Sequence, residues 1–123
     1  MRLSPILVAA SIITATLVSA PASAKLQASA LPVITITATA EQKFSPNHIV
    51  LHLKKKQTLH FVSLGGVHGV ESKDLGIPAT MIQPDKPVSV SVMPTKLGSY
   101  TLPCTIVCGA GHAEMALQID VKK

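Results

Sequence analysis

Short segments with the side-chain pattern of β-strands recur along this sequence, and they constrain its fold more than any other feature. Each has about five to seven residues and either alternates polar and apolar side chains or is rich in β-branched residues. They lie at residues 33–39, 49–53, 58–62, 88–92, 100–103 and 115–121. Clusters of Gly, Pro, Asn and Ser separate them, and no window carries a helical stripe of three turns. The pattern predicts an all-β fold of about six to eight strands, an antiparallel sandwich or barrel.

The first residues of the chain contain the three parts of a secretory signal peptide. Arg2 precedes an apolar run at residues 5–18, and Ala22 and Ala24 form an A-x-A cleavage site. We therefore predict a signal peptide at residues 1–24. Export would place the rest of the chain in the periplasm or another extracytoplasmic compartment.

The remaining residues, 25–123, have the ordinary size of one domain with a single core. An uncleaved membrane anchor is the alternative to cleavage, since the apolar stretch at residues 3–20 approaches the roughly 20 residues that a bilayer requires. The domain would be attached to a membrane only in that case. Nothing after Ala24 has the pattern of a second membrane span.

The predicted domain is moderately basic. Of eleven Lys and Arg residues only Arg2 lies in the predicted signal peptide, so the domain has ten lysines and six acidic residues. Nucleic acid is not expected as a partner, because the domain has no Arg and only three aromatic residues on which bases could stack. An acidic protein or an anionic membrane surface stays open.

One segment, CTIVCGAGHAEM at residues 104–115, contains both cysteines together with a histidine and a methionine. A disulfide between Cys104 and Cys108 is the first alternative for an exported chain with two cysteines. It would close a very short loop, and the stabilisation from a crosslink falls with loop length. It would also leave His112 and Met115 unexplained, so a metal site is the stronger hypothesis.

Thiolate, imidazole and thioether ligands form a soft set, which favours copper, and a weak methionine ligand is typical of copper electron-transfer sites. Zinc is the weaker candidate because structural zinc sites do not use Met. A further ligand must come from elsewhere, and His68 is predicted to supply it from a loop between Val67 and Gly69. The histidines at 48, 52 and 60 lie in or beside predicted strands and are interpreted as surface residues.

The segment at 104–115 resembles the C-x-x-x-C-G-x-x-H-x-x-M motif of the CuA domain, a cupredoxin found in subunit II of cytochrome c oxidase and in nitrous oxide reductase. Three other segments are similar to parts of that family: FSPNHIVLHLKKKQTLHFV, VHGVESKDLGIP and MPTKLGSY. The resemblance covers nearly the whole chain after residue 24. It implies a cupredoxin-like Greek-key β-sandwich with a centre of two copper ions.

The resemblance also implies a role for each ligand. Cys104 and Cys108 would bridge two copper ions, His68 and His112 would bind one each, and Met115 and the backbone carbonyl of Ile106 would be weak ligands. Since Cys108, His112, Met115 and His68 alone would make a mononuclear site, Cys104 is the additional ligand that favours two ions. Such a site leaves no open position for a substrate, so we expect a one-electron carrier and no enzymatic activity.

Several features differ from the oxidase pattern. Ile106 stands where oxidase members often have Glu, the chain has no Trp, and the domain is basic. The leading hypothesis is therefore a periplasmic carrier or electron-entry domain whose partner is a redox protein, such as a cytochrome or a respiratory oxidase component. The alternatives are a copper chaperone with a copper donor or acceptor as its partner, a mononuclear cupredoxin, and a structural module with a Cys104–Cys108 disulfide.

Overall fold

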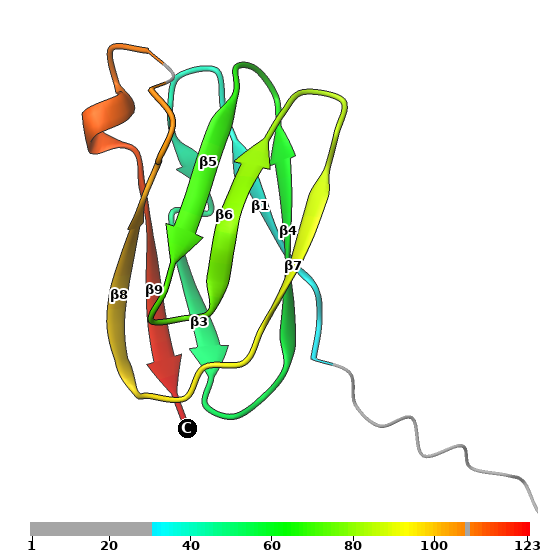
Figure 1. Ribbon diagram of the computed structural model, residues 1–123, viewed down its shortest axis with the longest axis vertical. Coiled ribbons are helices and arrows are strands. Elements are labelled where there is room, and N and C mark those ends of the chain that lie inside the picture. Colours follow the sequence, from blue (N-terminus) through cyan, green and yellow to red (C-terminus); the bar gives the residue numbers. More distant parts are fainter. Residues whose placement is uncertain (1–30, 108) are drawn as a thin grey trace, which may run out of the picture.

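The computed structural model describes residues 31–107 and 109–123 (Figure 1). Strands dominate this part of the chain, which confirms the predicted all-β class. The elements are β1 (Ile34–Ala38), β2 (Phe44–Ser45), β3 (His48–His52), β4 (Gln57–Ser63), β5 (His68–Ser72), β6 (Ile77–Ile82), β7 (Val88–Val92), β8 (Gly98–Pro103), the 3-10 helix η1 (His112–Glu114) and β9 (Ala116–Lys122). The predicted signal peptide at residues 1–24 lies outside the described residues. No helix in the described ranges is long and apolar enough to cross a bilayer.

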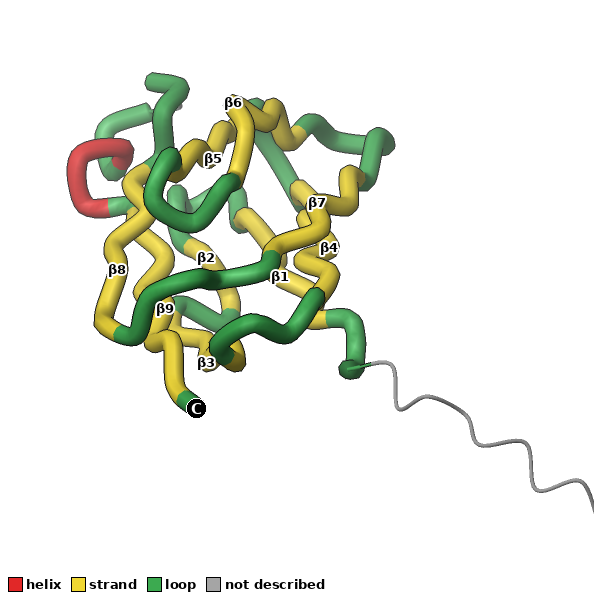
Figure 2. The backbone as a smooth tube through the Cα atoms, turned by 60° about the horizontal axis from the view of Figure 1, so that its bottom comes forward, coloured by secondary structure: helices red, strands yellow, loops and turns green. Residues whose placement is uncertain are grey.

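The strands form three sheets around one interior (Figure 2). The largest has the order β2-β1-β4-β7, the second has the order β3-β9-β8, and β5 pairs with β6. Alternating side chains of each strand point into this interior, as the period of two requires. In β4, for example, Leu59 and Phe61 are completely buried. Each such side chain contributes on the order of 1.5–3 kcal/mol of hydrophobic stabilisation.

Two strand pairs are parallel, so the prediction of an antiparallel sandwich was wrong for them. β1 pairs in parallel with β4, with Ile34 opposite Leu59, and β3 pairs in parallel with β9, with His48 opposite Gln118. β1 and β4 are separated by two strands in the sequence, and β3 and β9 are separated by five. The alternation of side chains reports which residues face the core, but it does not report the direction of the neighbouring strand.

β5 and β6 were missing from the sequence-based prediction, which placed His68 in a loop. The structure makes His68 the first residue of β5. The first three residues of this strand, His68, Gly69 and Val70, are all buried, so the strand shows no alternation of polar and apolar residues there. A strand that is covered on both faces cannot be recognised from a period of two.

The strand directions place two sets of loops at opposite ends of the domain (Figure 1). The turn at residues 64–67 and the described parts of the β8–β9 loop, residues 104–107 and 109–115, lie at the upper end in that view. The turns at residues 53–56 and 93–97 lie at the lower end, together with the C-terminal end of β9. All of the predicted metal ligands that the structure describes belong to the upper end.

Candidate metal centre

Cys104 and Met115 lie opposite each other where the β8–β9 ladder ends. The ladder pairs Pro103 with Ala116, and the backbone N–H of Cys104 then donates to the carbonyl of Met115 over 2.9 Å. Both side chains are buried, with 4% of Cys104 and 1% of Met115 exposed. The sheet itself therefore fixes the positions from which these two predicted ligands start.

A third predicted ligand group lies next to the Cys104 sulfur. The thiol donates a hydrogen bond to the carbonyl oxygen of Ile106 over 3.2 Å. The structure thus brings together the sulfur and the backbone oxygen that were predicted to bind metal. The chain then turns outward, and the side chain of Val107 is 81% exposed. Cys108 lies outside the described residues.

His112 begins the 3-10 turn that leads back to the sheet. Its N–H donates to the carbonyl of Gly109, and its own carbonyl accepts from the N–H of Met115, each over 3.2 Å. This tight turn keeps His112 close to Met115 along the chain. Unlike Met115, His112 is only partly buried, so it lies at the rim of the candidate site.

His68 has the most informative environment of the predicted ligands. His68 is buried, and only 1% of the residue is exposed. Nε2 lies 2.7 Å from the carbonyl oxygen of Gly65. Since a carbonyl only accepts, Nε2 carries the proton, and Nδ1 is left with an unshared electron pair. Within the described residues Nδ1 is buried without a hydrogen-bond partner. An unpaired buried polar group costs about 1–3 kcal/mol.

The ring of His68 is held by a turn that is itself anchored. The Ser63 hydroxyl donates to the carbonyl of Gly66 over 2.7 Å and accepts from the N–H of Gly65 over 3.2 Å. Gly66 adopts a positive φ of 75°, which the turn requires. A backbone carbonyl that accepts the second N–H of a histidine is the usual partner of a metal ligand, because it sets the tautomer and the ring orientation.

Gly69 brings β5 into contact with the ligand loop. Its carbonyl accepts from the N–H of Thr105 over 2.9 Å. A Cβ at position 69 would collide with the Thr105 hydroxyl and come within 2.9 Å of Ile106 Cγ1. Only glycine allows this approach, which joins the strand of His68 to the loop of Cys104. Sequence analysis missed this role, although a glycine inside a strand is a recognised sign of close backbone contact.

Gln42, in the β1–β2 loop, is a second contact that sequence analysis missed. Its side-chain oxygen accepts from the N–H of Gly111 over 2.6 Å. A Cβ at Gly111 would lie 2.8 Å from that oxygen, and a Cβ at Gly109 would lie 2.8 Å from Gln42 Cδ. The two glycines of the ligand loop therefore leave room for Gln42, which supports the loop next to His112.

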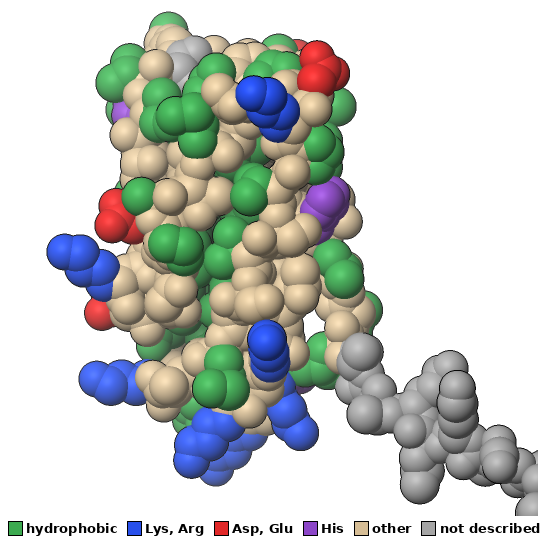
Figure 3. Space-filling view, turned by 45° about the vertical axis from the view of Figure 1, so that its right-hand side comes forward, with side chains coloured by type: hydrophobic (Ala, Val, Ile, Leu, Met, Phe, Trp, Pro, Cys, Tyr) green, Lys and Arg blue, Asp and Glu red, His purple; other side chains and the backbone are tan. Residues whose placement is uncertain are grey.

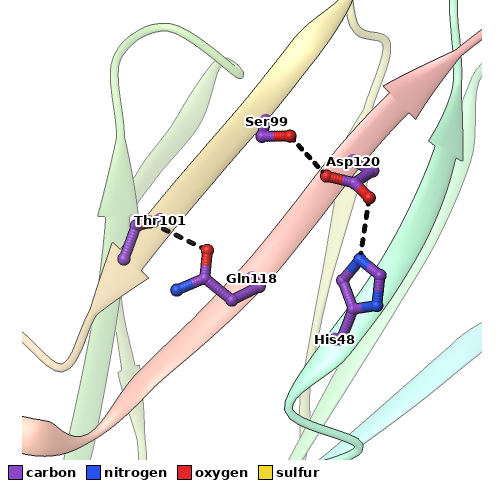
Figure 4. Close-up of polar contacts among 5 residues, drawn as sticks. All are labelled: His48, Ser99, Thr101, Gln118 and Asp120. Carbon is purple, nitrogen blue, oxygen red and sulfur yellow. Dashed lines mark hydrogen bonds and ion pairs between the residues drawn. The ribbon is translucent and has the colours of Figure 1, made fainter.

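The histidines that were predicted to lie on the surface have other partners. His60 Nδ1 lies 2.8 Å from the Ser89 hydroxyl. On the outer face of the β3-β9-β8 sheet, Asp120 accepts from Ser99 over 2.6 Å and lies 2.9 Å from His48 Nε2 (Figure 4). The hydrogen bonds from Ser99 and His48 lower the pKa of Asp120 from its ordinary value of 3.8. This network is separate from the predicted ligands.

The described residues contain no group of three or more His, Cys, Asp and Glu side chains close enough to hold a metal ion. The predicted donor set instead combines His68 Nδ1 and Cys104 Sγ with a thioether and a backbone carbonyl, on segments that the hydrogen bond from Thr105 to Gly69 joins. Nitrogen and sulfur donors of this softness fit copper. The buried, unpaired Nδ1 of His68 is the observation that fits a bound metal ion most directly.

The described residues thus form an all-β domain in which a buried histidine lies on a strand that is joined to a cysteine-containing hairpin loop. The family model of the cupredoxin-like domain matches residues 7–115, and the chain belongs to this family. Family membership implies copper as the metal. Comparison with curated proteins gives no match.

Solved structures show the same fold at low sequence identity. A chain of a heme-copper terminal oxidase dimer matches with a TM-score of 0.63 and 22% identity, over 72% of this chain and 63% of that chain. The periplasmic domain of subunit II of cytochrome oxidase from Bradyrhizobium japonicum matches with a TM-score of 0.67 and 17% identity, over 76% and 86%. Auracyanin A, a blue copper protein from Chloroflexus aurantiacus, matches with a TM-score of 0.57 and 14% identity, over 74% and 98%. The chain thus spans less than two thirds of the oxidase chain, and these similarities establish the fold alone.

Proposed function

We propose that this protein is an extracytoplasmic copper-binding electron carrier with a binuclear centre of the CuA type. The observation that carries the proposal is the environment of His68, whose protonated Nε2 is fixed by Gly65 and whose buried Nδ1 has no hydrogen-bond partner among the described residues. A histidine held in one tautomer, with its other nitrogen unpaired, is prepared to bind a metal ion.

The number of sulfur ligands favours two copper ions over one. A mononuclear site would use a single cysteine with two histidines and a methionine, and the segment at 104–115 contains a second cysteine. Cys104 is the additional ligand, and it lies buried between the ladder end and the Ile106 carbonyl. When bound, a pair of copper ions would supply reversible one-electron transfer.

The surrounding residues would favour electron transfer over substrate turnover. Burial of His68, Cys104 and Met115 excludes water from that side of the site. The sheet holds the backbone of Cys104 and Met115, so the ligands are prevented from moving far when the charge of the site changes. His112 is partly exposed, so it would be a natural contact for a redox partner such as a cytochrome or a respiratory oxidase component.

Copper delivery is the second candidate function. The partial exposure of His112 and the 81% exposure of Val107 favour it, because an incoming acceptor could reach the loop half of the site. A chaperone has to release its ion, whereas a carrier has to retain it. The donor or acceptor of copper would then be the partner in place of a redox protein.

Copper retention distinguishes the two candidates. The full chain is loaded with copper, passed through repeated cycles of reduction and reoxidation, and then mixed with a copper-free acceptor protein. A carrier retains its copper throughout, and its optical spectrum returns after each cycle. If the reduced protein transfers its copper to the acceptor, the carrier function is wrong and copper delivery takes its place.

A further inference from the structure

We propose that the end of the domain opposite the candidate metal centre binds the surface of an anionic lipid bilayer. Six lysines lie there, on three separate segments, and all six are exposed. They are Lys54, Lys55, Lys56, Lys96, Lys122 and Lys123. We call this set the lysine end.

Backbone hydrogen bonds bring the three segments of the lysine end together. The N–H of Leu53 donates to the carbonyl of Lys122 over 2.7 Å, which joins the β3–β4 turn to the C-terminal end of β9. The N–H of Lys54 donates to the carbonyl of Pro94 over 2.8 Å, which joins the same turn to the segment of Lys96. Figure 3 shows several of the lysine side chains grouped at the lower end of the molecule.

The lysine end contrasts in charge with the rest of the described domain. Its segments, residues 52–57, 93–98 and 121–123, contain no Asp or Glu. The other described residues have three lysines, at 43, 73 and 86, and all six acidic residues. The acidic residue nearest in sequence is Asp120, whose carboxylate is engaged by Ser99 and His48. The domain therefore carries a strong positive charge at one end and a net negative charge elsewhere.

The path of the chain favours a bilayer as the occupant. β1 begins at the lower end of the domain in Figure 1, so residues 31–33 enter the fold near the lysine end. Where the apolar stretch at residues 3–20 is retained, as in the alternative of an uncleaved membrane anchor, it is long enough to reach into a membrane. A bilayer that received this stretch would face the lysines, and basic segments beside a membrane are attracted to anionic lipids.

A redox partner is a poorer fit for the lysine end. β9 has seven residues and runs from the metal end to the lysine end. At a rise of about 3.3 Å per residue, the two ends are about 20 Å apart. A protein bound at the lysine end would therefore be far from the ligands. With the lysines on a membrane, the candidate metal centre would face away from the bilayer and stay accessible.

Vesicle flotation with the full chain tests the proposal. One set of vesicles consists of phosphatidylcholine and the other also contains phosphatidylglycerol. The test variant is Lys55→Gln/Lys56→Gln/Lys123→Gln, and the matched control is Lys43→Gln/Lys73→Gln/Lys86→Gln, which removes the same charge from exposed positions elsewhere. The readout is the ratio of binding to anionic and neutral vesicles, because the apolar N-terminal stretch would contribute to both.

The wild-type ratio should exceed about 100-fold and fall as salt is added. Each lysine near an anionic surface strengthens binding by about fivefold. The ratio should therefore fall roughly 100-fold when the test variant removes three such lysines, and it should fall much less in the control. The proposal is overturned if both triple variants lose binding equally, or if the test variant matches the wild type. In the latter case the lysine end would be a candidate for an acidic protein. Circular dichroism melting confirms that all three proteins are folded.

Discussion

The two halves of the candidate metal centre are constructed differently. His68, Cys104 and Met115 start from strand ends, and at most 4% of each is exposed. The other half is a loop whose described residues, 106–107 and 109–112, range from partly buried to 81% exposed at Val107. The strand-borne half is positioned by the same hydrogen bonds that form the fold. The loop half depends on a few contacts from neighbouring segments.

This difference indicates where rigidity and access come from. Core strands open only with the whole domain, whereas loops with few buried contacts open at a much lower free energy. A site that combines both can hold most of its ligands still while one side remains accessible to a partner. Each of the following experiments alters one half, the junction between the halves, or a surface remote from both.

Removal of His68, the nitrogen ligand that lies on a strand, should have the largest effect on copper binding. We expect His68→Ala to reduce copper affinity by more than about 100-fold, since even indirect partners of a ligand contribute 10–100-fold. His60→Ala is the matched control, because His60 also lies on a strand but bonds to Ser89. Competition with a chelator of known affinity measures both. Equal affinity of the two variants would contradict the assignment of His68.

Substitution of Gly69, which joins the two halves of the site, should have the next largest effect. In Gly69→Ala the new Cβ would collide with Thr105 and Ile106, so the ligand loop must shift. We expect a loss of about 1–3 kcal/mol in the free energy of unfolding, together with a changed copper spectrum. In Gly76→Ala the Cβ meets nothing, and only the strain at a φ of 68° remains. That control should lose stability without any spectral change.

Loss of the Gln42 contact should destabilise the loop half of the site less than the preceding substitution destabilises the domain. Gln42→Ala removes the hydrogen bond to Gly111, and we expect a loss of about 0.5–1.5 kcal/mol and roughly tenfold in copper affinity. Gln118→Ala removes a surface bond to Thr101 and serves as the control. Hydrogen exchange of the amide of Gly111 should accelerate in Gln42→Ala alone. Unchanged exchange would show that Gln42 does not support the loop.

The smallest effect should come from the outer face of the β3-β9-β8 sheet. Because the folded-state pKa of Asp120 is lowered, its carboxylate stabilises the protein above its unfolded pKa, near 3.8, and this contribution is lost as the pH falls through the folded pKa. Asp120→Asn should therefore flatten the acid side of the stability profile slightly. Copper binding should stay the same, since neither half of the site contacts this network.

The sequence predicted the fold class and most of the strands because those strands have one buried and one exposed face. The segment at 88–92 coincides with β7, where strict alternation matches the burial of Val90 and Val92. The cupredoxin-like family model at residues 7–115 confirms the resemblance to cupredoxins, while the finer assignment of the ligand motif to the CuA type remains a prediction. The signal peptide at 1–24 and the position of Cys108 remain predictions.

The features that could not be predicted depend on distant contacts. The parallel pairs β1–β4 and β3–β9 leave no local pattern, and Gln42 reaches a glycine 69 residues away in the sequence. His68 was identified as a ligand but placed in a loop, because buried Gly69 interrupts the alternation of β5. The orphaned Nδ1 depends on the fold around the ring and is visible only in three dimensions.

The most direct test of the account is the copper content of the full chain, combined with the electron paramagnetic resonance spectrum of the same sample. We predict two copper ions per chain and a hyperfine pattern from one unpaired electron shared equally by both, which Cys104→Ser should convert to a one-copper pattern. One copper ion per wild-type chain, with the hyperfine pattern of a single ion, would contradict the binuclear centre. No bound copper, with Cys104 and Cys108 oxidised to each other, would contradict the metal site itself.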